Sequence, residues 1–191
     1  NMASMINNIC LYKPRTKFIC EKILEYCRDE RKILLLSDRR EHLKDIKTLL
    51  DETQDTYTCG YYLGGMKEEE LSKTEEKDVI LGTFMMASEG FDCKYPLDSI
   101  ILTSPKSNIE QAVGRILRQE ARDRKFTPLV IDIIDEFSMF PKQGLKRIKF
   151  YQRNKYDMRT FDSNGKEIET PKKTKKPKVA DQDLEFLADS D

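Results

Sequence analysis

The most regular feature of the sequence is a series of short apolar runs, separated by longer segments with helical spacing of apolar residues. The runs are ILLL (33–36), VIL (79–81), IIL (100–102) and LVIDII (129–134), which have the length of strands. Strands that are apolar on both faces are covered by helices on both sides, as in parallel sheets. We therefore expect an α/β fold with a mainly parallel sheet and helices on both faces.

Five longer segments have the pattern of helices, and one of them is short and polar. They are residues 14–30, 39–52, 67–76 (the polar one), 108–119 and 137–156. In the first and last segments, Pro14 and Pro141 are positioned where a first helical turn accepts proline. Two further segments predict strands: residues 8–12, and residues 55–65, which end in a glycine pair suited to a turn.

The chain of 191 residues is long enough for one well-packed domain with a tail. We expect this domain to span residues 8–160. Residues 1–7 have the character of a linker or of a remnant of cloning. Residues 161–191 are polar and charged and contain prolines. Such a composition buries too little apolar surface to order a chain, so we expect a disordered tail.

Charge and hydropathy narrow the classes of function. Lys and Arg number 34, and Asp and Glu also number 34, so the net charge predicts neither a nucleic-acid nor a membrane partner. Any such site must be a local patch. The start of the sequence does not have the pattern of a signal peptide, and no apolar run reaches the roughly 18 residues of a spanning helix. We expect a soluble, cytoplasmic protein.

Residues that could bind a metal or act as a nucleophile are few. The five cysteines are at positions 10, 20, 27, 59 and 93, and His42 is the single histidine. This spacing contains no CxxC pair, which argues against a zinc site and against a disulfide framework. His42 lies among charged residues, so a position on a solvated helix explains it better than a catalytic triad. We expect no metal site and reduced cysteines.

Four segments with phosphate-binding chemistry follow the predicted strands. In an open α/β sheet, ligands bind beyond the carboxyl ends of the strands. The segments are SDRR (37–40), GTFMMASEGFDC (82–93), TSPKSN (103–108) and, on the helix that follows, QAVGRILR (111–118). Hydroxyls, backbone N–H groups and arginines bind phosphates. The candidates at this edge of the sheet are Ser37, Arg39, Thr83, Ser88, Gly90, Asp92, Arg115 and Arg118.

Each segment also has a simpler interpretation. Gln111, Arg115 and Arg118 lie at i, i+4 and i+7 on one helical face, but most arginines spaced in this way are solvated. SEGFD could be an ordinary turn, and Ser37 or Asp38 could cap a helix. The functional interpretation depends on the joint occurrence of the segments, in order and each after a strand.

In this order, the segments resemble the motifs of the second RecA-like domain of superfamily 2, DEAD-like helicases. KILLLSDRREHL (32–43) resembles motif IV and ILGTFMMASEGFDC (80–93) resembles motif V. QAVGRILR resembles motif VI and matches all fixed positions of Q-x-x-G-R-x-x-R. The step from Thr83 to Gly90 is one residue longer than in DEAD-box proteins and closer to the UvsW and poxvirus transcript-release branch. The similarity, which extends to helicases of large DNA viruses, covers about residues 8–157.

The resemblance implies a RecA-like three-layer fold and an ATP site shared with another domain. Arg115 and Arg118 would be arginine fingers on the γ-phosphate, and Gln111 would position the phosphates or the attacking water. Gly90 and Asp92 would contact the nucleotide ribose. Charge neutralisation at the γ-phosphate by such a finger is worth about 10³ to 10⁵ in rate. ATP with Mg²⁺ is thus the implied cofactor, bound mainly by an N-terminal RecA-like domain.

The resemblance also implies a nucleic-acid contact surface. Ser37, Arg39 and Thr83 would hold the backbone of the nucleic acid, with Arg40 and the Gly64–Gly65 turn as weaker candidates. The implied partners are DNA, with RNA as the alternative, and the N-terminal domain. The implied location is the host cytoplasm or a viral replication site, and we expect the isolated domain to be a monomer.

The sequence does not contain the phosphate loop GxxxxGK[ST] of a complete ATP site. The nearest segment, Gly60–Lys67, has methionine where the lysine belongs, and the acidic end of LVIDIIDE (129–136) differs from a DExH or DEAD box. We therefore expect this chain alone to be inactive as an ATPase. Two alternatives remain: a nucleic-acid-binding module without catalysis, and a protein-interaction scaffold that uses the charged tail.

Overall fold

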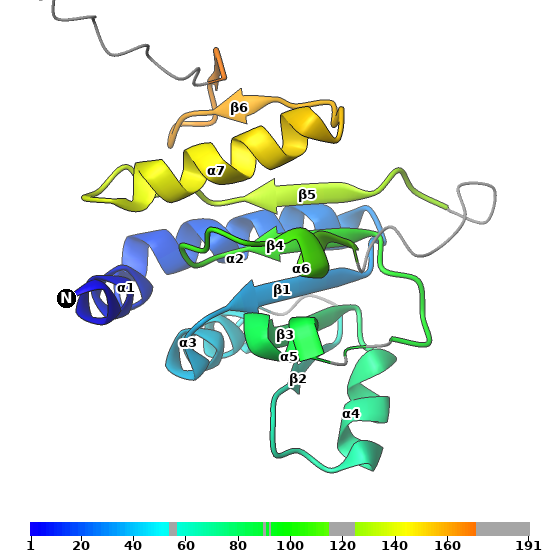
Figure 1. The fold of residues 1–191 in the computed structure, drawn as a ribbon. Coiled ribbons are helices and arrows are strands. Elements are labelled where there is room, and N and C mark those ends of the chain that lie inside the picture. The colour runs from blue at the N-terminus through cyan, green and yellow to red at the C-terminus, as the bar shows by residue number, and fades with distance from the viewer. Residues whose placement is uncertain (54–56, 90, 92, 115–124, 171–191) are drawn as a thin grey trace, which may run out of the picture.

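The computed structural model describes residues 1–53, 57–89, 91, 93–114 and 125–170. Five parallel strands form one sheet in the order β2–β3–β1–β4–β5 (Figure 1). Their bounds are β1 Ile33–Ser37, β2 Cys59–Tyr62, β3 Val79–Thr83, β4 Ser99–Leu102 and β5 Leu129–Asp132. The expected α/β class with a parallel sheet is confirmed.

The helices cover both faces of the sheet, and the alternation of side chains along the strands explains how (Figure 1). Ile33 and Leu35 of β1 belong to the apolar cluster that includes residues of α2 (Lys13–Arg28) and α3 (Arg40–Asp51). Leu34 and Leu36 belong to the opposite cluster, with residues of α5 (Phe84–Glu89), α6 (Glu110–Gly114) and α7 (Phe140–Arg153). Each such side chain contributes about 1.5–3 kcal/mol on full burial.

Two predictions about the N-terminus are wrong. Residues 8–12 do not form a strand, and residues 1–7 are not a linker, because Met2–Cys10 forms helix α1. The side chain of Asn1 caps this helix by accepting a hydrogen bond from the backbone N–H of Ala3 at 3.0 Å. Ile6 and Cys10, four positions apart on one helical face, pack against Phe140. Helix α1 therefore belongs to the domain.

Other differences concern the chain after β2. Helix α4 (Glu68–Glu75) follows β2 and was predicted. Helix α5 follows β3 and was not predicted. Strand β5 is half-buried because it lies at the edge of the sheet. Strands β6 (Thr160–Phe161) and β7 (Glu167–Ile168) pair antiparallel in a segment expected to be a tail without structure. The expectation for the remaining tail, residues 171–191, lies outside the described residues.

Candidate functional site

The carboxyl ends of the central strands bring the predicted segments together. Ser37 at the end of β1 is the register partner of Thr83 at the end of β3. On the other side of β1, Leu36 is the partner of Leu102, after which the loop 103–109 leads into α6. Segments far apart in the sequence thus lie at one edge of the sheet.

Ser37 is fully buried, and its hydroxyl holds the turn that follows β1. The hydroxyl oxygen lies 3.1 Å from Nδ1 of His42 and accepts a hydrogen bond from the backbone N–H of Arg39 at 3.2 Å. The backbone N–H of Asp38 donates to the hydroxyl of Ser104 at 2.8 Å. The predicted contact of Ser37 with nucleic acid stays a prediction, and the hydroxyl has a structural role in this arrangement.

His42 is buried rather than solvated, which corrects the expectation for this residue. Burial, and then the charge of the nearby Arg15, lower the pKa of His42 to about 4. The imidazole is therefore neutral at pH 7, and its Nε2 has no hydrogen-bond partner among the described residues. The neutral ring, hydrogen-bonded to Ser37, helps to stabilise the turn after β1.

The two arginines of the turn donate hydrogen bonds to oxygens of other segments. Arg39 donates from Nε to the side-chain oxygen of Asn7 at 2.5 Å and from Nη2 to the carbonyl oxygen of Ala3 at 3.4 Å, so α1 holds its guanidinium. Arg40 donates from Nη2 to the carbonyl oxygen of Gly64 at 2.7 Å. Gly65 has φ of 89°, a left-handed conformation that favours glycine. The structure thus brings Arg40 and the Gly64–Gly65 turn together.

Thr83 lies at the junction between β3 and α5. Its hydroxyl oxygen accepts a hydrogen bond from the backbone N–H of Met86 at 3.3 Å, at the start of the helix. Its side chain is half-buried. This position is compatible with the predicted backbone contact, which stays a prediction.

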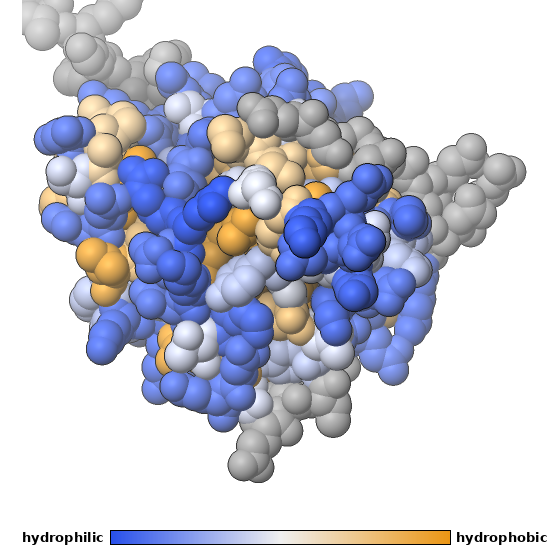
Figure 2. Space-filling view, turned by 90° about the horizontal axis from the view of Figure 1, so that it is seen from below, coloured by the Kyte–Doolittle hydropathy of each residue, from blue (hydrophilic) through white to orange (hydrophobic). Residues whose placement is uncertain are grey.

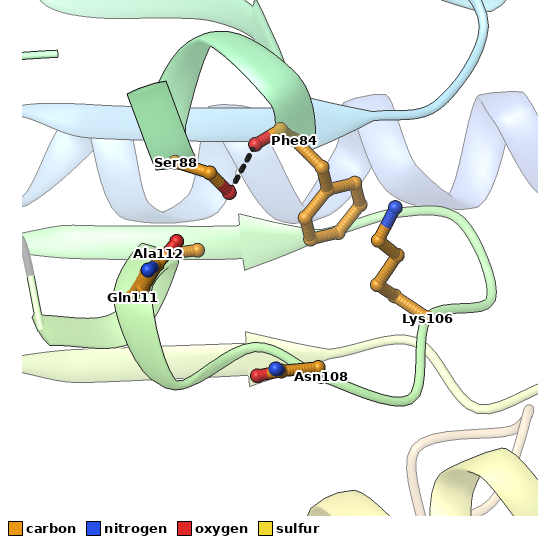
Figure 3. A pocket seen from close by; sticks show the side chains of 6 residues that line it. All are labelled: Phe84, Ser88, Lys106, Asn108, Gln111 and Ala112. Carbon is orange, nitrogen blue, oxygen red and sulfur yellow. Dashed lines mark hydrogen bonds between the residues drawn. The ribbon is translucent and has the colours of Figure 1, made fainter. Parts of the chain in front are cut away.

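A small pocket lies between α5 and the segment that leads into α6 (Figure 3). Its volume is about 150 Å³, and its lining comprises Phe84, Ser88, Lys106, Asn108, Gln111 and Ala112. Gln111, a predicted catalytic residue, is exposed on α6. Lys106 contributes a cation to this pocket. The sequence analysis selected its segment, TSPKSN, but did not name Lys106 as a candidate residue.

Two buried arginines hold the loop after β4, and the sequence did not predict either. Arg15 on α2 forms an ion pair with Asp135, at 2.6 Å, and donates to the carbonyl oxygen of Thr103 at 2.6 Å. Arg147 on α7 forms an ion pair with Asp132, at 2.8 Å, and donates to the carbonyl oxygen of Lys106 at 2.5 Å. Asp135, three residues after the end of β5, is therefore a structural partner of Arg15 in this arrangement.

Four predicted site residues lie outside the described residues: Gly90, Asp92, Arg115 and Arg118. Their roles stay predictions. Within the described part of the chain, no group of three or more His, Cys, Asp or Glu side chains is arranged to hold a metal ion. All five cysteines are free thiols, and burial raises the pKa of Cys20 and of Cys59 to about 12. The described helices include none with the length and apolar character needed to cross a membrane.

Comparisons with known proteins relate the chain to viral helicases. It is 39% identical over 163 residues to a protein of Acanthamoeba polyphaga mimivirus provisionally named ATP-dependent RNA helicase L396. It is 30% identical over 116 residues to an African swine fever virus protein provisionally named ATP-dependent RNA helicase QP509L. These matches cover 84% and 61% of this chain, but only 31% and 21% of the two relatives. No family model matches the chain.

Solved structures show the same fold. The structure of phage T4 UvsW matches with a TM-score of 0.65 and 23% identity, over 82% of this chain and 36% of that chain. The helicase MrfA, bound to DNA and AMPPNP, matches with a TM-score of 0.54 and 19% identity, over 73% of this chain and 20% of that chain. The chain is thus related in sequence to viral proteins named as helicases, and its five-stranded parallel sheet gives it the fold of RecA-like helicase domains.

Proposed function

We propose that the chain is the second, C-terminal motor domain of an ATP-dependent helicase or translocase. In this proposal it supplies motifs IV, V and VI to an ATP site that an N-terminal RecA-like domain completes. The observation that carries the proposal is that the segments of motifs IV and V meet at one edge of the sheet, where Ser37 and Thr83 are register partners. The limited share of the relatives that the chain spans, 31% and 21%, supports a further domain.

The residues of this chain would act on the nucleotide by position and charge. ATP with Mg²⁺, when bound, supplies the phosphoryl group. Arg115 and Arg118 would neutralise charge at the γ-phosphate, Gln111 would orient the phosphates or a water, and Gly90 and Asp92 would contact the ribose. Of these, Gln111 is exposed beside the pocket, which suits a residue that must reach a ligand. Hydrolysis would depend on closure of the two domains, because the arginines arrive only then.

The nucleic acid would lie along the turn after β1 and the start of α5. Thr83, Arg39 and, as we predicted, Ser37 are the candidate contacts, with Arg40 and Gly64–Gly65 beside them. In the described structure Arg39 is bonded to α1, so a nucleic acid would have to replace the contacts with Asn7 and Ala3. Contact of Arg39 with a nucleic acid would therefore compete with its hydrogen bonds to α1.

DNA is our proposed substrate, with RNA as the alternative. MrfA is a structural neighbour described as bound to DNA, and the step from Thr83 to Gly90 resembles the DNA-translocating branch. The two viral relatives are named as RNA helicases, which favours the alternative. The two substrates differ in the 2′-hydroxyl, which a protein can recognise directly.

The test is ATP hydrolysis by the full-length protein with single-stranded DNA, with RNA of the same sequence, and without nucleic acid. We expect hydrolysis stimulated by DNA, and no turnover by the isolated 191-residue chain. Stimulation by RNA alone would contradict the choice of DNA. Turnover by the isolated chain would contradict the proposed division of the ATP site.

A further inference from the structure

The pocket between α5 and α6 has the composition of an anion site. Among its six lining residues, Lys106 is the one charged side chain, and none is a carboxylate. Asn108 and Gln111 add side-chain amides, and the ring of Phe84 forms an apolar wall with Ala112 (Figure 3). Amide N–H groups and a lysine ammonium are donors that suit an anion with several oxygens.

The hydrogen bonds of the lining side chains determine which of their donors remain for a ligand. The side-chain oxygen of Asn108 accepts from the backbone N–H of Glu110 at 3.3 Å, which leaves its NH₂ group as the donor. The hydroxyl of Ser88 donates its proton to the carbonyl oxygen of Phe84 at 2.8 Å, so Ser88 is not counted among the donors. The donor set is therefore Lys106, Asn108 and Gln111.

Lys106 is held in a defined position and has a carboxylate competitor. The guanidinium of buried Arg147 anchors its carbonyl oxygen, and Arg147 is itself paired with Asp132. Its ammonium lies 3.2 Å from Oδ1 of Asp38 and 5.5 Å from the centre of the Phe84 ring. An ammonium has three N–H donors, so the pair with Asp38 uses only part of its capacity. A site whose loop is fixed before binding loses less entropy on binding.

We propose that this pocket binds a phosphate group, that Lys106 supplies its cation, and that Asp38 competes with the phosphate for that cation. The phosphate would come from the nucleic-acid strand or from ATP, because both bring the same chemistry to this edge of the sheet. The inference deepens the proposed function and rests on it. It adds Lys106 and Asn108 to the residues that the motif resemblance implies.

The experiment compares Lys106→Gln and Asp38→Asn in the full-length protein. One arm measures the affinity for fluorescein-labelled single-stranded DNA by anisotropy over a series of KCl concentrations. The other arm measures the affinity for a fluorescent ATP analogue with Mg²⁺. Lys44→Gln is the matched control, because Lys44 pairs with Glu41 at 2.7 Å on α3, on the other face of the sheet.

We expect Lys106→Gln to lower the affinity for one of the two ligands about tenfold, which corresponds to the loss of a hydrogen bond to a charged group. If the ligand is the strand, the salt dependence of log K should decrease by about 0.7, one phosphate contact to single-stranded nucleic acid. Asp38→Asn should strengthen binding of the same ligand. This gain should disappear in the double variant with Lys106→Gln, because it acts through the ammonium.

Two results would overturn the inference. In the first, Lys106→Gln binds both ligands as Lys44→Gln does. In the second, Asp38→Asn weakens binding as Lys106→Gln does, which would mean that the ion pair only supports the fold. Failure of the proposed function is a different result: wild-type protein without nucleic-acid-stimulated hydrolysis. The two binding arms do not need turnover, so they separate the two failures.

Discussion

The loop after β4 and the β2 edge of the sheet are stabilised in different ways. At the loop, buried Arg15 pairs with Asp135 and buried Arg147 pairs with Asp132. Both arginines also donate hydrogen bonds to carbonyl oxygens of the loop. At the β2 edge, the described contacts of Asp78 with Thr58 are exposed. Figure 2 shows the β2 side of the molecule, which is mainly hydrophilic with separate hydrophobic spots.

The difference shows where this fold uses buried charge. A buried ion pair costs desolvation and is weak evidence of net stability, but removal of one partner leaves an uncompensated charge. Both buried pairs support the loop that carries Lys106, at the edge where the motif segments meet. We infer that they serve the geometry of that edge more than the stability of the domain.

The largest effect should come from Arg147→Met, which removes the cation beside Asp132. Asp132 also accepts a hydrogen bond from the hydroxyl of Tyr151 at 2.9 Å, so the change leaves a buried carboxylate with one neutral partner. We expect a loss of about 3–5 kcal/mol in the free energy of unfolding, measured with urea. Arg153→Met on the same helix is the control, because its pair with Glu110 is exposed and should be worth at most about 1 kcal/mol. Equal losses in the two variants would contradict the comparison.

A smaller effect should appear as a pH dependence of stability through His42. Its pKa is near 6.5 in an unfolded chain and is lowered to about 4 here, so the unfolded state binds more protons between these values. This contribution to stability is fully present above pH 6.5 and is lost as the pH falls towards 4, on the order of 3 kcal/mol in total. Urea unfolding at pH 7.5 and pH 5 measures it. His42→Gln should reduce the difference between the two pH values, and an unchanged difference would argue against a buried neutral imidazole.

The smallest effect should come from Asp78→Ala at the β2 edge. The carboxylate accepts hydrogen bonds from the backbone N–H of Thr58 at 2.6 Å and from its hydroxyl at 2.7 Å, in an exposed position. Water can replace both bonds, so we expect a loss of about 1 kcal/mol or less. Urea unfolding of this variant and of Arg147→Met compares the two losses in the free energy of unfolding. A loss as large as that of Arg147→Met would mean that the stability of the domain depends as much on the exposed contacts at the β2 edge as on the buried ion pairs.

The sequence predicts much of the fold because local pattern determines it. Apolar runs gave the strands β1, β3, β4 and β5, and the rule for parallel sheets placed Ser37 and Thr83 at one edge. Helix α1 was missed because its few apolar residues also suit a short strand, and only the contact of Ile6 and Cys10 with Phe140 decides between them.

The support of the site could not be predicted, since it consists of contacts between residues distant in the sequence. Arg15 and Asp135 are 120 positions apart, and neither periodicity nor motif indicates that they pair. His42 was expected to be solvated because its neighbours are charged, yet α3 turns it towards Ser37 and the interior. Lys106 lies in a segment that was selected because it follows a strand, but only the structure shows that it pairs with Asp38.

The central claim is that this domain supplies arginines to an ATP site completed by another domain. The most direct measurement is the nucleic-acid-stimulated ATPase rate of the full-length protein with Arg115→Ala, together with its affinity for the same nucleic acid. We expect the rate to fall by about 10³-fold or more, while the affinity is retained. An unchanged rate with a weakened affinity would contradict the claim and favour a binding module without catalysis.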